Sequence, residues 1–274
     1  LAELGEMLAQ PDCRAITIVG PGGIGKTRLA LALAHRHQAT FAAAAWQSVA
    51  GLVDASDLVP IVAQAFDLDG AADGHALERL QQVDGRLLLV IDNFEHLLPG
   101  GVAEVETLLS ALPALVCVIT SREALAASWE WRYAVDELPY PAAADDTNLG
   151  DYAAVQFFLQ LARRTRPRYA IQRAELPDVV RICQLVGGLP LGIEFAAAHV
   201  GRLPCAAIAD NLAAGLDTLD AMQESTLRDL PVRQRSVVAS FESSWKMLAP
   251  EEQRVLATLS VLRGEFTVEA ALAI

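Results

Sequence analysis

Hydrophobic and polar positions follow two different rhythms along the 274 residues of the chain. In the first half, short apolar runs alternate with segments whose apolar residues recur every three or four positions. These are the spacings of buried strands and of amphipathic helices. Strands are predicted over 15–19, 43–49, 86–91, 116–120 and 131–135, and helices between them over 58–66, 77–83 and 102–112. This alternation predicts an α/β fold with a mostly parallel sheet.

The rhythm changes at a stretch rich in Pro, Ala and acidic residues, 138–146, beyond which the pattern is helical. Helices are predicted over 152–164, 176–186, 191–200 and 205–216, and then, after a second change near 222–231, over 232–248, 250–262 and 267–274. We therefore expect a first domain at 1–146, a helical domain at 147–222 and a partial third domain at 223–274. The last helix is cut off mid-pattern, which indicates that the third domain is incomplete.

A glycine-rich segment from Gly20 to Thr27 joins the first predicted strand to a predicted amphipathic helix. It has the pattern G-x-x-x-x-G-K-[ST] of a phosphate-binding loop. A triphosphate is held most easily by backbone N–H groups at a helix N-terminus, where the macrodipole is positive, and glycines let the backbone approach it closely. The residues predicted to bind the nucleotide from this loop are Gly22, Gly23, Ile24, Gly25, Lys26, Thr27 and Arg28.

Two side chains of this loop have separate predicted roles. Lys26 reaches the β and γ phosphates as a compact cation, and the Thr27 hydroxyl takes one position on Mg²⁺. An apolar strand further along the chain ends in Asp92, which is expected to hold the same ion through water; a strand-end turn is the plainer interpretation of this aspartate. The predicted cofactors are ATP or ADP with Mg²⁺, and the predicted metal site is Thr27 with Asp92.

The positions after Asp92 bear on hydrolysis. Asn93 can position a water molecule, but its amide cannot take the proton. Glu95 could replace the missing base, and a glutamate in the first turn of a helix, near the positive end of the dipole, is an equally good interpretation. The candidate catalytic residues are Lys26, Asp92, Asn93, Glu95 and Arg122.

Arg122 follows the predicted strand 116–120. A guanidinium at the carboxyl end of a parallel strand can sense a γ-phosphate through charge-assisted hydrogen bonds, whereas an ordinary surface arginine is the alternative. In the helical domain, Gly187 and Gly188 end one predicted helix and Pro190 begins the next, which taken alone is a helix–helix turn.

Composition narrows the classes of function. The hydrophobic content of 53% is that of a packed globular protein, and the net charge of −13 opposes direct binding of nucleic acid by this chain. The four cysteines have no metal-like spacing, and no apolar run approaches the roughly 20 residues that span a bilayer, so a reduced, cytoplasmic protein without membrane contact is expected. The chain begins at Leu1 rather than Met, which indicates a piece of a longer protein.

The order of these motifs resembles the signal-transduction ATPases with numerous domains (STAND, NB-ARC-like), and more closely the ATP-binding module of large bacterial transcriptional regulators. The segments that carry the resemblance are 20–27, 87–97 with its Asp-Asn-Phe-Glu-His core, 120–125, 188–191 followed by Glu194 and 196–198, 233–245, and 248–252. Together they cover nearly the whole chain.

This resemblance implies a P-loop sheet, a helical lid whose Pro190 contacts the nucleotide, and the start of a winged-helix domain. It also implies a regulatory switch between an ADP-like closed state and an open signalling state, with slow hydrolysis. The implied partners are the nucleotide, other domains of the same parent protein and, in a nucleotide-dependent way, further copies of the chain.

Two other classes also pair a P-loop with helices. A small-molecule kinase has a mobile lid and needs an acceptor pocket with a base near the γ-phosphate. A ring-forming ATPase of the AAA+ type needs an arginine finger across a subunit interface, for which Arg163, Arg164 and Arg166 are the candidates.

Overall fold

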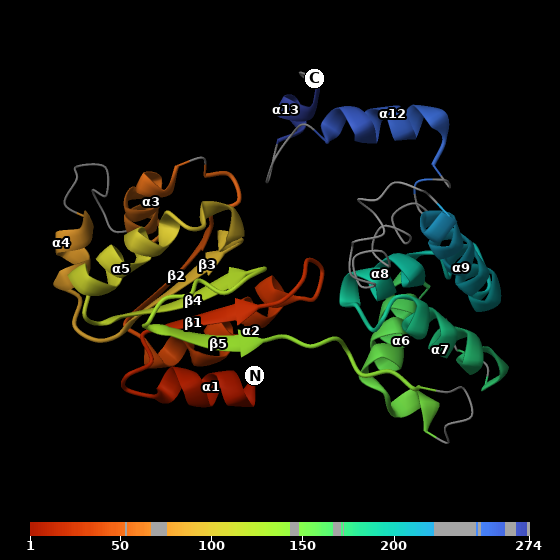
Figure 1. Cartoon of the computed structure of the whole chain (residues 1–274), viewed down its shortest axis with the longest axis horizontal. Coiled ribbons are helices and arrows are strands. Elements are labelled where there is room, and N and C mark those ends of the chain that lie inside the picture. The colour runs from red at the N-terminus through yellow and green to blue at the C-terminus, as the bar shows by residue number, and fades with distance from the viewer. Residues whose placement is uncertain are drawn as a thin grey trace. The chain divides into compact units, whose positions relative to one another are not determined.

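The computed structural model describes residues 1–52, 54–66, 76–142, 148–166, 171, 173–221, 245, 248–260 and 267–272. Two compact units account for most of them (Figure 1). The sheet unit contains Leu1–Gly20 and Gly25–Val135, and the helical unit contains Asp136–Val261.

The sheet unit is built on five parallel strands in the order β2-β3-β4-β1-β5. Their bounds confirm the five predicted strands to within one residue: β1 (Ala15–Val19), β2 (Ala43–Ser48), β3 (Leu87–Asp92), β4 (Leu115–Ser121) and β5 (Glu130–Ala134). Because β4 lies between β1 and β3, the segment that follows β4 lies between the segments that follow its two neighbours.

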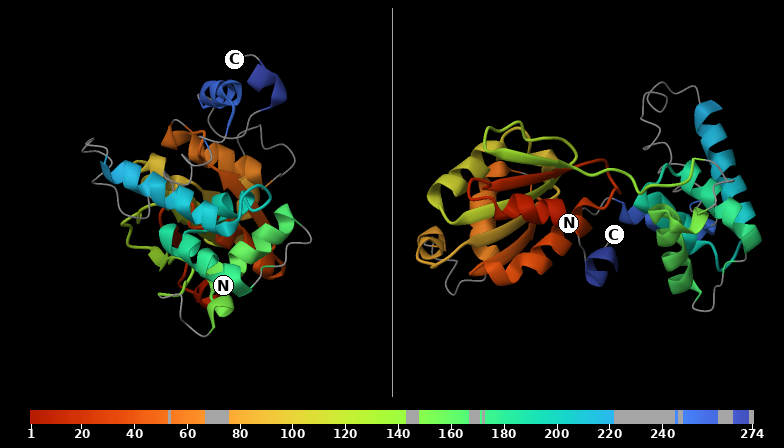
Figure 2. Two further views of the ribbon diagram at one scale, coloured as in Figure 1. Left: turned by 90° about the vertical axis from the view of Figure 1, so that its right-hand side faces the viewer. Right: turned by 90° about the horizontal axis from the view of Figure 1, so that it is seen from below.

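Helices cover both faces of this sheet (Figures 1 and 2). On one face, α1 (Ala2–Ala9) and α2 (Lys26–His37) pack against apolar side chains of β1, β3 and β4. On the other face lie α3 (Leu58–Ala65), α4 (Ala76–Gln81) and α5 (Gly101–Ala111). A strand buried on both faces is apolar at every position rather than at alternate ones, which explains the continuous run of β3.

Most helices of the sheet unit were predicted, but α1 was missed. It is short, and its two buried residues, Leu4 and Leu8, are one helical turn apart. That i, i+4 spacing is the signal that could have identified it. Short 3-10 turns complete the unit: η1 (Gln38–Thr40), η2 (Ala55–Asp57) and η4 (Phe94–Leu97).

In the part of the helical unit that the structure describes up to residue 221, four longer helices confirm the predicted ones, and the last runs past its predicted end at 216. They are α6 (Ala153–Thr165), α7 (Leu176–Leu185), α8 (Pro190–Ala198) and α9 (Cys205–Ala221), with the short turns η5 (Leu149–Asp151) and η6 (Arg173–Glu175). Their shared core is apolar and includes the fully buried Phe158 and Ile193. Among the described residues, no helix combines the length and hydropathy that crossing a bilayer needs.

The segment that leads into the helical unit is bound to the turn before α8. Leu138 N donates to Gly188 O at 3.1 Å, and Ala154 N donates to Pro139 O at 3.0 Å. Gly188 has φ +67°, and a Cβ there would collide with the Leu138 carbonyl oxygen. Because these residues pack with the helices, the helical unit begins at Asp136. The domain bounds, with a first boundary at 146, stay predictions.

Toward the end of the chain, the structure describes α12 (Pro250–Leu259) and α13 (Val268–Leu272), which agree with two predicted helices. The predicted helix at 232–248 lies, except for Trp245 and Leu248, outside the described residues. The partial winged-helix domain at 223–274 therefore stays a prediction. Cys13, Cys117 and Cys183 are buried free thiols, the first two in the sheet unit and the third in the helical unit.

Candidate functional site

The carboxyl ends of β1, β4 and β3 bring the predicted site residues of the sheet unit to one edge of the sheet. Parallel sheets bind their ligands at this edge. Among the described residues, the polar or charged residues that are buried as a whole are Thr17, Lys26, Asp92, Thr120 and Ser121. Asp92, Thr120 and Ser121 lie at the ends of β3 and β4, and Lys26 begins the helix that follows β1 and its glycine loop.

The glycine loop has the backbone of a phosphate cradle. Gly23 and Gly25 have φ of 78° and 99°, in the left-handed region that glycine tolerates. Gly25 is the N-cap of α2, and the structure shows no side chain capping that helix end. The loop thus places the N-terminus of α2, with the positive end of its dipole, where helix ends bind anions.

Lys26 lies across the loop that precedes it. Its side chain is 8% exposed, and Nζ donates to Gly20 O at 2.9 Å. Burial lowers the pKa of Lys26, while the nearby carboxylate of Glu95 acts in the opposite direction. The buried ammonium is therefore poised for an anionic ligand, which would offset the cost of its desolvation.

Asp92 is the centre of a hydrogen-bond network. Its Oδ1 accepts from Thr27 Oγ1 at 2.8 Å and from Thr120 Oγ1 at 2.6 Å, and its Oδ2 accepts from Asn93 Nδ2 at 3.2 Å. The predicted pair Thr27 and Asp92 is thus brought together. Because Thr27 gives its only hydroxyl proton to Asp92, its lone pairs remain to coordinate a cation.

Asn93 contacts Asp92 rather than standing apart from it. Its backbone has φ 63° and ψ 50°, a left-handed conformation that is uncommon outside glycine. The backbone N donates to Thr120 Oγ1 at 3.0 Å. With its side-chain amide on Asp92, Asn93 begins the turn η4 that carries Glu95.

Glu95 and Arg122 form an ion pair at the same edge. Arg122 Nε lies 3.0 Å from Glu95 Oε1, and the two side chains are 66% and 19% exposed. Glu95 Oε2 is buried, and among the described residues it has no hydrogen-bond partner. A buried carboxylate oxygen in this condition usually binds a water or a ligand group, so Glu95 lies where a reacting water could be held.

Thr120 was not predicted to belong to this site. Its segment was noted because Arg122 follows it, and a threonine inside an apolar strand is an ordinary β-former. Its contact with Asp92 depends on the strand order, since β4 pairs with both β1 and β3. The signal available in the sequence was a polar residue at the end of a run that is otherwise apolar.

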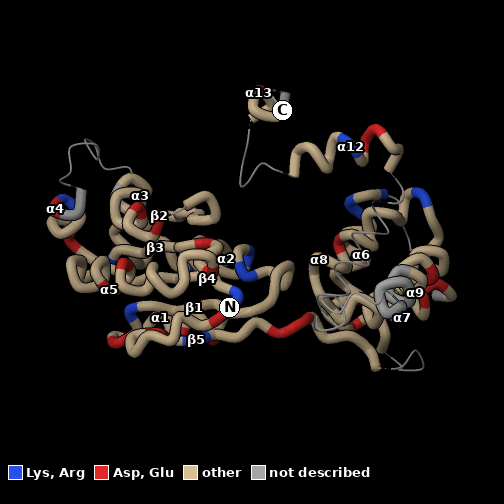
Figure 3. The backbone as a smooth tube through the Cα atoms, turned by 45° about the horizontal axis from the view of Figure 1, so that its top comes forward, with Lys and Arg blue, Asp and Glu red and all other residues tan. Residues whose placement is uncertain are grey.

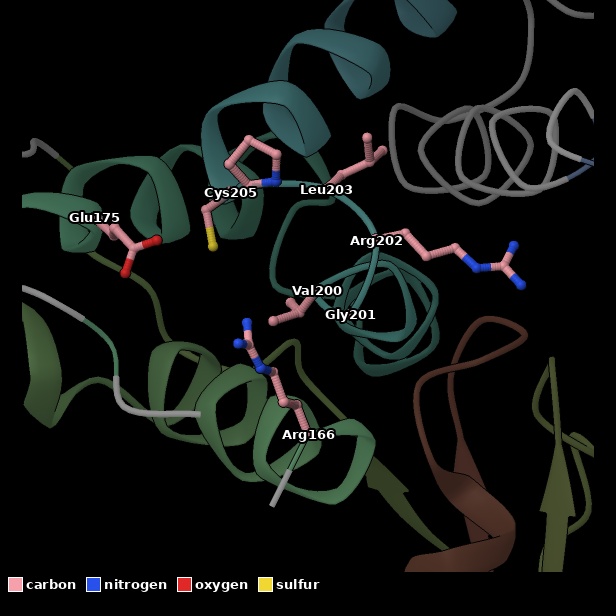
Figure 4. A pocket seen from close by; sticks show the side chains of 8 residues that line it. Arg166, Glu175, Val200, Gly201, Arg202, Leu203 and Cys205 are labelled. Atoms are coloured by element: carbon pink, nitrogen blue, oxygen red, sulfur yellow. The ribbon is translucent and has the colours of Figure 1, made fainter. Parts of the chain in front are cut away.

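The described helical unit holds Pro190 and a separate pocket. Pro190 begins α8, as its position after the glycine pair predicts. The pocket has a volume of about 290 Å³ and is lined by residues 200–205 with Arg166 and Glu175. Figure 4 shows Arg166 and Cys205 directed into it and Arg202 directed away. Of the three arginine-finger candidates, Arg166 thus lines a pocket of its own unit.

The donors at the sheet edge fit a magnesium nucleotide. The loop offers backbone N–H groups and a buried ammonium for phosphates, and Thr27 and Asp92 offer oxygen ligands, which Mg²⁺ prefers. Acidic residues are distributed over the chain (Figure 3), in keeping with its net charge of −13.

Comparison with known proteins supports a nucleotide-binding module. Residues 1–99 match the NB-ARC domain. A Mycobacterium tuberculosis protein that carries the name of an HTH-type transcriptional regulator is 31% identical over 265 residues, which are 95% of this chain and 28% of that protein. An uncharacterized protein of the same organism is 30% identical over 266 residues, 96% of this chain and 64% of its own length. The chain thus spans less than two thirds of these relatives.

Among solved structures, the STAND protein with a tetratricopeptide repeat sensor from Pyrococcus horikoshii aligns with a TM-score of 0.51. The two sequences are 18% identical, and the alignment covers 99% of this chain and 36% of that protein. At this identity the likeness concerns the fold. It supports a P-loop sheet followed by helices, as the sequence predicted.

Proposed function

We propose that the chain is an NB-ARC-like P-loop module of the STAND type. In this proposal it is the ATP- and ADP-binding switch of a signal-transducing, transcription-regulating protein, and it hydrolyses ATP slowly with Mg²⁺. The observation that carries the proposal is the meeting of Lys26, Thr27 and Asp92 at one edge of the sheet. The relative named as a transcriptional regulator supports the regulatory context.

In this proposal the phosphates lie on the backbone N–H groups of Gly22 to Thr27, with Arg28 beside them. Lys26 exchanges its contact with Gly20 O for the β and γ phosphates. Thr27 holds Mg²⁺ directly and Asp92 holds it through water. The ion supplies charge neutralisation between the phosphates. These are the ordinary roles of lysine, threonine and aspartate side chains toward phosphates and Mg²⁺.

Hydrolysis is proposed to be slow because the candidate general base, Glu95, is already paired with Arg122. Asn93 binds Asp92 through its amide and has no group that takes a proton. Glu95 has the right chemistry, but one of its oxygens pairs with Arg122. Arg122 must turn from Glu95 to a γ-phosphate before both residues can act.

The switch needs more than this one contact. Inverting a population from 1:99 to 99:1 requires about 5.5 kcal/mol of differential binding. A charged hydrogen bond from Arg122 to a γ-phosphate supplies about 1.5–3 kcal/mol. We therefore propose that Pro190 of the helical unit also contacts the nucleotide, and that other domains of the parent protein, and nucleotide-dependent self-association, contribute the rest. A cytoplasmic location suits such a protein.

Calorimetric titration of the purified chain with ATP and ADP, with Mg²⁺ present, tests the proposal. We expect saturable binding of both, and a loss of about 10- to 100-fold in affinity for Lys26→Ala, the value of one charged hydrogen bond. Arg36→Ala is the matched control, because Arg36 is an exposed cation on the same helix, away from the loop. Absence of binding, or equal affinity of Lys26→Ala and the original chain, would contradict the proposal.

A further inference from the structure

Thr120 lies at the centre of the sheet edge and has a fixed hydroxyl. Its side chain is fully buried, on the strand between β1 and β3. Oγ1 donates its single proton to Asp92 Oδ1 at 2.6 Å and accepts the N–H of Asn93 at 3.0 Å. A hydroxyl that uses its donor and one acceptor in this way has no rotational freedom left.

The Thr120 bond to Asp92 is the shortest and most buried one that this carboxylate receives. The bond from Thr27 is 2.8 Å long and partly buried, and the bond from Asn93 Nδ2, at 3.2 Å, is at the long end of the normal range. Thr27 belongs to α2, whereas Thr120 belongs to the sheet. Thr120 therefore holds the Asp92 side chain from the neighbouring strand β4.

The same hydroxyl also holds the start of the turn that carries Glu95. Asn93 adopts a left-handed backbone, which has a conformational cost for a residue with a side chain, although a smaller one for asparagine than for most. The hydrogen bond from its N–H to Thr120 offsets part of that cost. Two residues beyond Thr120 is Arg122, which pairs with Glu95. One side chain thus joins the metal-side carboxylate to the turn that bears the candidate base.

We propose that Thr120 is a positioning residue of the magnesium-nucleotide site: its hydroxyl orients Asp92 toward Mg²⁺ and fixes the turn that carries Glu95. This inference rests on the proposed function, because it assigns Thr120 to the same site. It adds a buried residue of β4 to a magnesium site otherwise built on Thr27, in the segment after β1, and Asp92, at the end of β3.

A merely structural role of Thr120 and a positioning role predict different measured effects of its variants. Valine has the shape of threonine, so Thr120→Val removes the hydroxyl and leaves the packing, while Thr120→Ser keeps the hydroxyl. A structural role would change the free energy of unfolding alone. A positioning role changes the Mg²⁺ concentration that half-saturates ATP binding, because a misaligned carboxylate holds the ion less well.

The experiment measures ATP binding over a series of Mg²⁺ concentrations and in excess EDTA, together with single-turnover hydrolysis. Thr120→Val is expected to raise the half-saturating Mg²⁺ concentration by about tenfold, the scale of one hydrogen bond to a charged group, and to slow hydrolysis. Binding in EDTA, which depends on Lys26 and the loop, stays within twofold. Thr120→Ser restores both values. Thr17→Val, a change at another fully buried threonine of the sheet, is the matched control and has no effect on them.

Equal Mg²⁺ dependence of Thr120→Val and the original chain would overturn the inference while leaving the proposed function intact. If Lys26→Ala also left ATP binding unchanged, the proposed function itself would fail. Should Thr120→Val not fold, Thr120→Cys replaces it, since a thiol is a weak donor of similar size. Thr120→Cys must then show the raised Mg²⁺ requirement, and a value equal to that of Thr120→Ser would refute the assignment.

Discussion

The sheet unit and the helical unit bury different kinds of side chain. Among the described residues, all polar or charged residues that are buried as a whole lie in the sheet unit, and four of them gather where β1, β3 and β4 end. The buried side chains of the helical unit are apolar. Burying polar groups costs free energy unless they are paired. The difference therefore separates a unit that carries chemistry at one edge from a unit whose interior serves packing.

The largest expected effect is a loss of packing in the helical unit. Phe158 is fully buried on α6, and Phe158→Ala should lower the free energy of unfolding by about 3–5 kcal/mol through lost transfer and the cavity left behind. Phe158→Leu, which keeps most of the volume, should lower it by less than about 1.5 kcal/mol. Urea unfolding followed by circular dichroism measures both. A loss below about 1 kcal/mol for the alanine variant would show that this interior is not close-packed.

A smaller effect is expected at the glycine pair of the helical unit. Gly187 and Gly188 both have left-handed backbones, with φ of 60° and 67°. A Cβ at Gly187 meets nothing within 4 Å, whereas one at Gly188 collides with the Leu138 carbonyl. Gly187→Ala should therefore lower the free energy of unfolding by about 1 kcal/mol, and Gly188→Ala by about 2–3 kcal/mol. Equal losses in the two variants, measured by thermal unfolding, would mean that the bound segment at Leu138 shifts freely.

The smallest effect, of opposite sign, belongs to the sheet unit. Burial lowers the pKa of Lys26 below its ordinary 10.5, so the folded chain binds this proton less tightly than the unfolded chain. Below that lowered pKa the lysine is charged in both states and the burial penalty is fully present; the penalty disappears as the pH rises from the lowered pKa to 10.5.

Lys26→Met should therefore raise the free energy of unfolding at neutral pH by up to about 1 kcal/mol, and this gain should shrink as the pH approaches the ordinary pKa of lysine. Urea titrations across that pH range, without nucleotide, provide the measurement. A gain that grows with pH would contradict a burial penalty on the charged lysine. A stabilising variant that no longer binds ATP would sharpen the contrast between a unit built for binding and one built for packing.

Local pattern was enough to predict most elements of both units, with α1 as an exception. Each strand ends within one residue of its prediction, since continuous apolar runs bounded by polar residues leave little choice. Lys26, Thr27 and Asp92 were predicted as a group because the loop motif and the strand-end aspartate have a fixed chemical relation. The structure brings Thr27 and Asp92 to 2.8 Å.

The contacts of Thr120 and Asn93 could not be predicted in the same way. Both depend on β4 lying next to β3, and the strand order is set by long-range packing rather than by any one segment. The left-handed backbone of Asn93 and the contact of its amide with Asp92 were not predicted, and its expected role in positioning water stays a prediction. The roles of Glu95, Arg122 and Pro190 toward a nucleotide remain predictions for binding and hydrolysis experiments.

The buried cysteines give each unit its own chemical reporter. Burial raises the pKa of Cys117 in the sheet unit to about 12, and that of Cys183 in the helical unit to about 12. Since thiol reagents attack the thiolate, both residues are shielded until their surroundings open. Labelling rates at Cys117 and Cys183, resolved by mass spectrometry, would therefore measure the opening of the two units separately in one sample. The natural cysteines can then show, without an engineered label, which of the two units is stabilised when nucleotide is added.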